Sequence, residues 1–220
     1  MKKKPETKDV TDAVNKKRAA ERVKGLDDKL SEDERNAFYD QSSERSMAIV
    51  LGSIVENRLT ELLQLLMRRD KSLVNEMFNP SGPLGPFGTK IRLAYMLRIV
   101  SPETYKDLAI INKIRNKFAH DLSITAFEDQ QISAWIQNMH LYSIVKKMAE
   151  DAAERLKNNV YEGKFDRTKD FIASNAILSF KDSYRDCLRY MIHHLSDHVN
   201  AIRATENDLN SKEVSAPDKL

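Results

Sequence analysis

The sequence predicts an all-α protein, a bundle of antiparallel helices, on three observations. Only 6 Gly and 6 Pro interrupt 220 residues, so long segments run without helix breakers. Apolar residues recur at three- and four-residue steps over most of the chain, which is the period of an amphipathic helix. The best candidate for a strand, residues 123–127, is too short to build a sheet.

Three regions are expected along the chain. Residues 1–30 are charged and poor in large apolar side chains, which is typical of a flexible basic segment. Within it, Lys16, Lys17 and Arg18 are candidate nucleic-acid contacts, although a solubilising tail explains them more simply. Residues 31–204 should form a single helical-bundle domain, and residues 205–220 a flexible, frayed tail.

The helical domain is expected to begin at Ser31, because Ser31 and Glu34 have the spacing of a capping box. The next helix ends at the charged residues 68–71. Its apolar stripe consists of Met47, Val50, Leu51, Ile54, Val55, Leu59, Leu62, Leu63 and Leu66. Residues 79–88 hold half of the chain's Gly and Pro and therefore predict a loop.

A helix over residues 91–99 follows this loop. Ser101 then has the character of an N-cap, with Pro102 at the first helical position. The helix that they open should bury one apolar side, made of Leu108, Ile111, Ile114 and Phe118. Two more helical segments are expected, at about 129–156 and 167–203.

Charge and cysteine content narrow the classes of function. The 36 basic and 33 acidic residues give a net charge of +3, so nucleic-acid binding would need a local patch. The single cysteine, Cys187, excludes a disulfide framework and a Cys-rich zinc site, and fits a reducing compartment. No apolar stretch has the length of a membrane span, and no secretory signal is present. We therefore expect a cytoplasmic protein without a membrane, metal or cofactor.

The residues with the clearest chemical potential lie on the helix after Ser101. Asn112, Asn116 and His120 follow one another at four-residue steps, so their side chains share one side of that helix. Arg115 precedes Asn116 and has a long side chain that can reach the same line. This pattern places a permanent cation near an imidazole, a group that titrates near neutral pH.

Arg115-Asn116, followed by three residues and His120, resembles the R-x4-H signature of the HEPN superfamily, whose members are helical bundles that often dimerise. The resemblance implies a HEPN-like bundle that cleaves RNA without a metal. His120 would move a proton at the ribose 2′-hydroxyl, and Arg115 would stabilise charge on the phosphorane. Asn116 would orient the phosphate or the imidazole. In a homodimer, Arg115 and His120 of two subunits would line one cleft.

A longer ordered series resembles the mannitol operon repressor family. It consists of residues 82–85, 90–97, 105–108, 114–120 and 127–129, and covers about residues 45–135. This resemblance implies a repressor of sugar-alcohol uptake genes, working with a regulatory protein partner or with RNA or another nucleic acid. The chain keeps both Arg115 and His120, so catalysis stays open.

Each of these residues also has a purely structural interpretation. His120 can meet the negative end of a helix dipole, while Arg115 bonds free carbonyls in the last turn. Glu56 lies near Gly52, where another helix can approach, and would support Arg115 by pairing with it. A half-exposed helix charge explains Glu56 slightly better.

Other candidates are weaker. His194 and His198 have the spacing of a shared metal site, but no third ligand fits, and a solvated helix surface explains His193, His194 and His198 better. Trp135 can stack on a base, yet its apolar neighbours favour the core. Two hypotheses remain: a regulatory or interaction protein, placed first, and a metal-independent endoribonuclease, a toxin or defence effector, placed second. Whether the protein is an enzyme stays open.

Overall fold

The computed structural model describes residues 31–39, 43–67, 70–161 and 179–214, and these ranges form helices without any strand. The helices are α2 (Glu32–Tyr39), α3 (Glu44–Leu65), α4 (Lys71–Phe78), α5 (Phe87–Met96), α6 (Pro102–His120), α7 (Gln130–Gln137), α8 (His140–Tyr161) and α10 (Phe180–Val214). The predicted all-α class is therefore confirmed. The basic residues Lys16, Lys17 and Arg18 lie outside the described residues.

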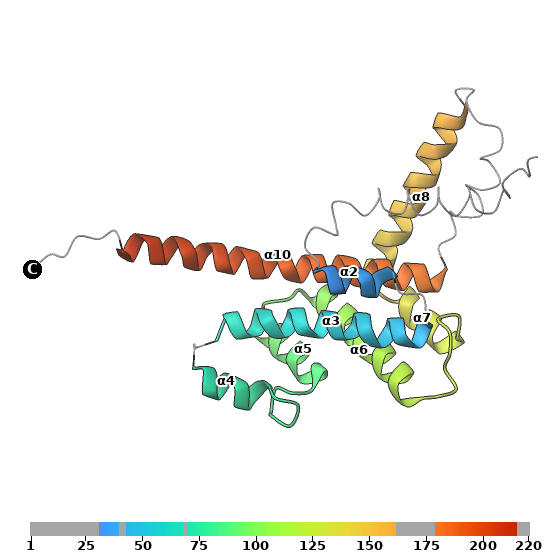
Figure 1. The fold of residues 1–220 in the computed structure, drawn as a ribbon. Coiled ribbons are helices and arrows are strands. Elements are labelled where there is room, and N and C mark those ends of the chain that lie inside the picture. The colour runs from blue at the N-terminus through green and yellow to red at the C-terminus, as the bar shows by residue number, and fades with distance from the viewer. Residues whose placement is uncertain (1–30, 40–42, 68–69, 162–178, 215–220) are drawn as a thin grey trace, which may run out of the picture.

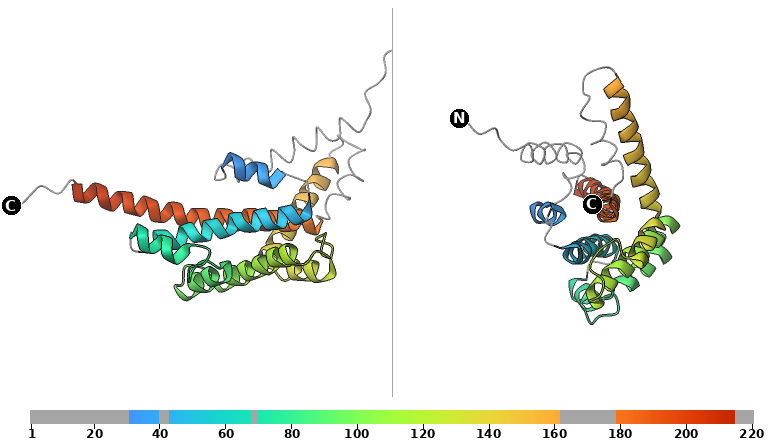
Figure 2. Two further views of the ribbon diagram at one scale, coloured as in Figure 1. Left: turned by 60° about the horizontal axis from the view of Figure 1, so that its bottom comes forward. Right: turned by 90° about the vertical axis from the view of Figure 1, so that its right-hand side faces the viewer.

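Helix α3 lies at the centre of the bundle (Figure 1). Helix α10 packs along one side of α3, and α5 and α6 pack along another, as the two further views agree (Figure 2). Helix α7 lies near the end of α6, and α8 leaves the bundle as it runs away from α6 and α10 (Figure 1). The far end of α10 extends beyond the other helices. The bundle thus presents α6 to solvent along its outer side.

The helix starts follow the sequence closely. The backbone N–H of Ser31 donates to Glu34 Oε2 at 2.8 Å, and the N–H of Glu34 donates to Ser31 Oγ at 3.2 Å, so the capping box is confirmed. The hydroxyl of Ser101 accepts from the N–H of Thr104, with Pro102 opening α6 as predicted. These caps fix the points at which the chain turns into the bundle.

The core is built from the predicted apolar stripes. Leu108, Ile111, Ile114 and Phe118 of α6 are all fully buried. Most of the α3 stripe is buried as well, but Val50 is 43% exposed and Leu66 is 48% exposed. Val50 therefore lies at the margin of the stripe, and Leu66 is the C-cap just past the last residue of α3. The core therefore fixes α6 against α3 along its inner side.

Four helical segments differ from the expectation. Helix α5 begins at Phe87, inside the expected loop 79–88, and ends at Met96, before residue 99. Helix α4 begins at Lys71, capped by the side chain of Asp70, although it buries no residue. The segment expected at 129–156 is divided into α7 and α8, and the buried carboxylate of Asp107 accepts the N–H groups of His140 and Leu141 at the start of α8. Helix α10 continues to Val214, well past the expected end at residue 203.

Candidate functional site

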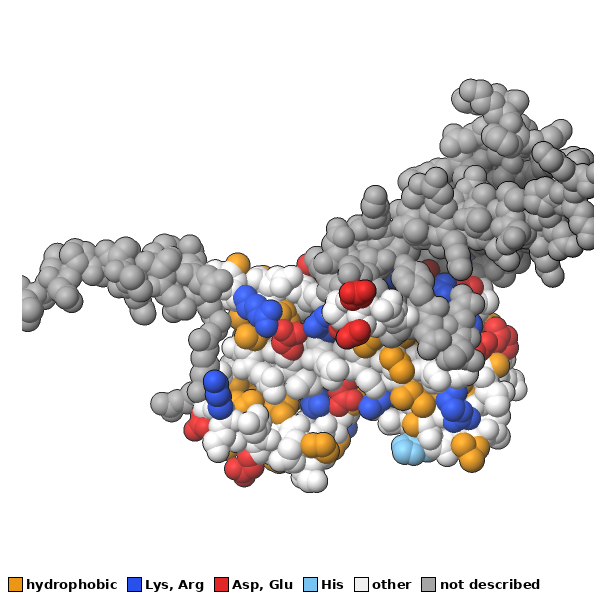
Figure 3. Space-filling model, viewed as in Figure 1, with side chains coloured by type: hydrophobic (Ala, Val, Ile, Leu, Met, Phe, Trp, Pro, Cys, Tyr) orange, Lys and Arg blue, Asp and Glu red, His pale blue; other side chains and the backbone are white. Residues whose placement is uncertain are grey.

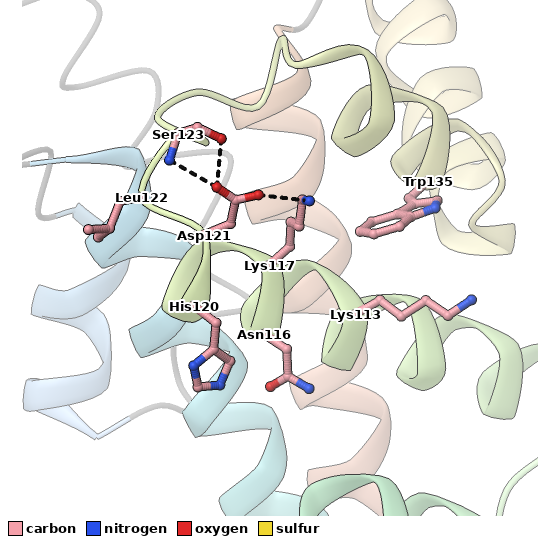
Figure 4. Close-up of a pocket in the computed structure, with 8 residues that line it drawn as sticks. All are labelled: Lys113, Asn116, Lys117, His120, Asp121, Leu122, Ser123 and Trp135. Atoms are coloured by element: carbon pink, nitrogen blue, oxygen red, sulfur yellow. Dashed lines mark hydrogen bonds and ion pairs between the residues drawn. The ribbon is translucent and has the colours of Figure 1, made fainter.

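The outer side of α6 carries the predicted polar line. The side-chain amide of Asn116 donates to Asn112 Oδ1 at 3.3 Å, so these two residues share one side of the helix. Asn116 and His120 are both exposed, and they line a shallow groove at the C-terminal end of α6 (Figure 4). The groove residues are Lys113, Asn116, Lys117, His120, Asp121, Leu122, Ser123 and Trp135.

Of the two lysines in the groove, one forms an ion pair with a described residue and the other does not. Lys117 Nζ lies 2.9 Å from Asp121 Oδ2, and the backbone N–H and hydroxyl of Ser123 donate to Asp121 Oδ1 at 3.0 Å and 2.6 Å. The Ser123 hydroxyl and then Lys117 hold the pKa of Asp121 well below its usual range. By contrast, Lys113 is exposed and has no ion-pair partner among the described residues. Lys113 is therefore the cation that the groove offers to a ligand.

Arg45 holds the end of α6 in place. Its guanidinium donates to three backbone carbonyls, those of Phe118, Asp121 and Ile124, the last two at 3.0 Å and 2.6 Å. The neighbouring Glu44 accepts the N–H of Phe127 at 2.7 Å. Because these contacts satisfy carbonyls that a helix end leaves free, they position the segment after His120. Sequence reasoning missed Arg45, since its partners lie more than seventy positions away.

The inner side of α6 carries an ion network. Arg115 Nη1 lies 2.8 Å from Glu56 Oε2, and Lys90 Nζ lies 2.8 Å from Glu56 Oε1. The side chains of Arg115, Glu56 and Lys90 are 27%, 14% and 8% exposed. One mostly buried carboxylate is thus shared by cations from α5 and α6. The pairing considered for Glu56 is present, and Lys90 is a member that the sequence did not suggest.

Gly52 allows this network to form. A Cβ atom added at Gly52 would lie 3.1 Å from Cδ of Arg115, so the stem of the arginine packs directly on the α3 backbone. The guanidinium carbon of Arg115 lies 6.0 Å from the centre of the Phe87 ring. These contacts orient Arg115 toward α3 and α5.

Arg115 and His120 therefore leave α6 in different directions. Five residues along a helix correspond to a rotation of about 140°. His120 lines the groove, whereas Arg115 is not among the groove residues. Within one chain, the structure brings Asn116 and His120 into one groove, keeps Asn112 bonded to Asn116 outside that groove, and pairs Arg115 with Glu56 elsewhere.

The remaining candidates also have clear positions. Trp135 is half-buried: it packs against the hydrophobic core, as its apolar neighbours suggested, and also borders the groove (Figure 4). The rings of His194 and His198 lie 4.6 Å apart, but His193 is buried, which corrects the expectation of a solvated surface for all three. Among the described residues, no group of three His, Cys, Asp or Glu side chains is placed to hold a metal ion. Nor is any described helix long and apolar enough to cross a membrane.

The charge distribution on one face of the molecule is mixed. Lys, Arg, Asp and Glu side chains are interspersed there, and no broad basic area is visible among its described residues (Figure 3).

The chain belongs to the mannitol repressor family, whose match covers residues 27–187. This range includes α2 to α8 and the first turns of α10, and so extends beyond the part that the sequence motifs suggested. The family description assigns a regulatory role to its members.

Individual relatives agree with this assignment. The mannitol operon repressor of Escherichia coli strain K12 is 22% identical over 142 residues, which are 63% of this chain and 72% of that protein. The same identity and coverage hold for the mannitol operon repressor of E. coli O6:H1.

Two solved structures resemble the fold. A possible transcriptional regulator from Shigella flexneri has a TM-score of 0.54 at 17% identity, and the match covers 76% of this chain and 99% of that chain. The structure of the MtlR–HPr complex from E. coli has a TM-score of 0.48 at 18% identity, covering 72% of this chain and 90% of that chain.

Proposed function

We propose that the protein is a cytoplasmic transcriptional regulator of the mannitol-repressor type, which acts by binding and not by catalysis. One observation carries this proposal: Glu56 holds the guanidinium of Arg115, at 2.8 Å. An arginine that stabilises a phosphorane must be free to bind the new negative charge. Here that charge would compete with a carboxylate that is already in place and mostly buried. The arrangement favours a structural role for Arg115.

The groove beside His120 is the contact surface in this proposal. Lys113 supplies an unpaired charge, Asn116 an amide, and Trp135 part of an indole surface. These groups suit a phosphate, a base, or an acidic and apolar patch on another protein. Since a single unpaired lysine gives only weak attraction to nucleic acid, we expect modest affinity and weak salt dependence for RNA.

The regulatory proposal is tested in the host cell. Deletion of the gene should raise the transcripts of sugar-alcohol uptake genes, and the wild-type gene should restore repression. A Lys113→Ala/His120→Ala double variant should fail to restore it. Lys146→Ala, which removes an exposed lysine of α8, serves as the matched control and should restore repression. Unchanged transcripts in the deletion strain would refute the regulatory role.

The contact surface is tested directly by fluorescence. Trp135 is the single tryptophan of the chain, so its emission, excited selectively over that of the tyrosines, reports on the groove. We expect a saturable change in emission with one of two titrants, single-stranded RNA or HPr, the protein named in the E. coli complex. Loss of the change in Lys113→Ala would assign it to the groove. An unchanged spectrum with both titrants would contradict the proposal that they bind there.

The second candidate function is metal-independent RNA cleavage. It is favoured by His120 and Asn116, which are exposed beside Lys113 in one groove. In this case a homodimer would supply Arg115 from the other subunit, after release from Glu56. RNA should then be cut in the presence of a chelator, and both His120→Ala and Arg115→Ala should abolish cutting. Intact RNA, together with a monomer in sedimentation, would exclude this function.

A further inference from the structure

A second concave site lies at the opposite end of α6 from the groove. The first turns of α6 and α8 and the middle of α10 enclose a cleft of about 570 Å³, within the usual range of small-molecule pockets. Its polar lining includes Glu103, Thr104, His140, Tyr190 and His194. No lysine or arginine lines it, so the cleft offers no cation to a phosphate.

Several polar groups in the cleft have free hydrogen-bonding capacity. The hydroxyl of Tyr190 donates to the sulfur of Met148 at 2.9 Å, which leaves its oxygen available as an acceptor. The ring nitrogens of His140 and His194 have no hydrogen-bond partner among the described residues. The carboxylate of Glu103 is exposed at the rim, where its own backbone N–H and then the hydroxyl of Ser101 lower its pKa. Donors, acceptors and the exposed carboxylate of Glu103 thus face a common space, which the buried Asp107 also lines.

The wall of the cleft is rigid and partly apolar. Asp107 is 1% exposed, and its carboxylate accepts two backbone N–H groups of α8, at 2.7 Å and 3.0 Å. These bonds fix the start of α8 against α6. Met191 and Ile144 add apolar surface, and the Ile144 side chain is 37% exposed. A ligand with C–H surfaces and several hydroxyl groups matches such a lining, because it has donors and acceptors along its whole length.

We propose that this cleft binds a neutral polyhydroxylated molecule of sugar size, a sugar alcohol or a sugar, as the effector of the regulator. The role of this ligand as an effector rests on the proposed function, but its binding in the cleft does not. Helix α6 is about 28 Å long and joins the cleft at its first turn to the groove at its last. A ligand that orders the α6–α8 contact can therefore act on both ends of one rigid element. A phosphorylated sugar is excluded by Glu103 and by the lack of a lysine or arginine in the lining.

The binding test uses the imidazole NMR signals of the full chain. Of the 5 histidines, His140 and His194 line the cleft, whereas His120 lies in the groove. Titration with mannitol or glucose should shift the signals of His140 and His194 saturably and leave that of His120 in place. The two titrants distinguish a sugar alcohol from a sugar. Mannitol 1-phosphate tests whether the cleft accepts an anionic ligand, and spermidine tests whether it prefers a cationic amine.

Two variants and one control sharpen the test. Tyr190→Phe removes one hydroxyl and should weaken binding about threefold to tenfold. Glu103→Gln should weaken it by about tenfold or more, since its hydrogen bonds are charge-assisted. Tyr142→Phe changes a tyrosine of α8 that does not line the cleft and should bind as the wild type does.

Each outcome decides the proposal. It is overturned if neither mannitol nor glucose shifts His140 and His194, if the phosphate binds as well as they do, or if spermidine binds in their place. Unaltered affinity in both Tyr190→Phe and Glu103→Gln would also overturn it. If the sugar alcohol binds and the deletion strain shows no change in transcripts, the cleft stands and the proposed regulatory function fails. If transcripts change in the deletion strain and no titrant binds, the proposed regulatory function stands and the cleft proposal fails.

Discussion

The two polar sides of α6 use similar residues in opposite ways. On the inner side, Arg115 and Lys90 share the carboxylate of Glu56, and all three side chains are largely removed from water. On the outer side, Lys113 and His120 are exposed. The inner charges are paired within the protein, whereas the side chains of Lys113 and His120 are available to a partner.

The comparison teaches that a linear motif can be divided by the helix that carries it. Arg115 and His120 are close in sequence, and their spacing resembles a catalytic signature. Because the helix turns by about 140° between them, the first is packed into the bundle and the second faces solvent. The motif therefore joins a structural residue to a surface residue within one chain.

The largest expected effect breaks the inner side. Glu56→Ala should lower the free energy of unfolding by about 3 kcal/mol, because it leaves Arg115 and Lys90 as poorly hydrated cations without their common partner. Urea denaturation gives the value. Glu61→Ala is the control on the same helix. The carboxylate of Glu61 is 28% exposed, against 14% for Glu56, and pairs with two arginines, so its loss should matter by less than about 1 kcal/mol. If Glu56→Ala and Glu61→Ala lowered the free energy of unfolding equally, the shared carboxylate of Glu56 would stabilise the protein no more than a more exposed ion pair does.

The next effect concerns the end of α6. Arg45→Ala removes a guanidinium that serves three backbone carbonyls and should cost about 2 kcal/mol. Amide hydrogen exchange should accelerate in residues 121–127, which Arg45 and Glu44 hold. Arg45→Lys keeps the charge but loses the planar fork, so its loss should be intermediate. Unchanged exchange in 121–127 would mean that the loop is held by other contacts.

A third variant, at a residue outside α6, tests whether urea denaturation resolves a small change in the free energy of unfolding. Arg98 has a φ of 58°, the left-handed conformation that favours glycine after a helix. Arg98→Gly should therefore raise the free energy of unfolding by about 1 kcal/mol. Arg98→Ala retains the Cβ atom and should bring no such gain. A gain of the same size from alanine would place the cause in the lost charge and not in the backbone.

The fold was largely predictable because its signals are local. The capping box at Ser31, the N-cap at Ser101 and the apolar side of α6 each depend on residues within one or two turns. The division between α7 and α8 was missed, because the buried carboxylate of Asp107 that starts α8 comes from a distant helix.

The candidate site was predictable only in part, for the same physical reason. The alignment of Asn112, Asn116 and His120 follows from helical spacing alone. The membership of Lys90 in the ion network depends on how α5 packs against α3, and no local pattern encodes that distance. The exposure of Val50 likewise depends on which neighbouring helices reach the edge of α3.

The two exposed groove residues should contribute least to stability and most to binding. His120→Ala and Lys113→Ala should each change the free energy of unfolding by no more than about 0.5 kcal/mol, since both side chains are exposed. The same two variants should abolish the response of Trp135 to the groove ligand. Denaturation and fluorescence titration of one preparation give both values. If either variant destabilised the protein by as much as Glu56→Ala, the outer side would be structural too, and the separation of the two sides of α6 would not hold.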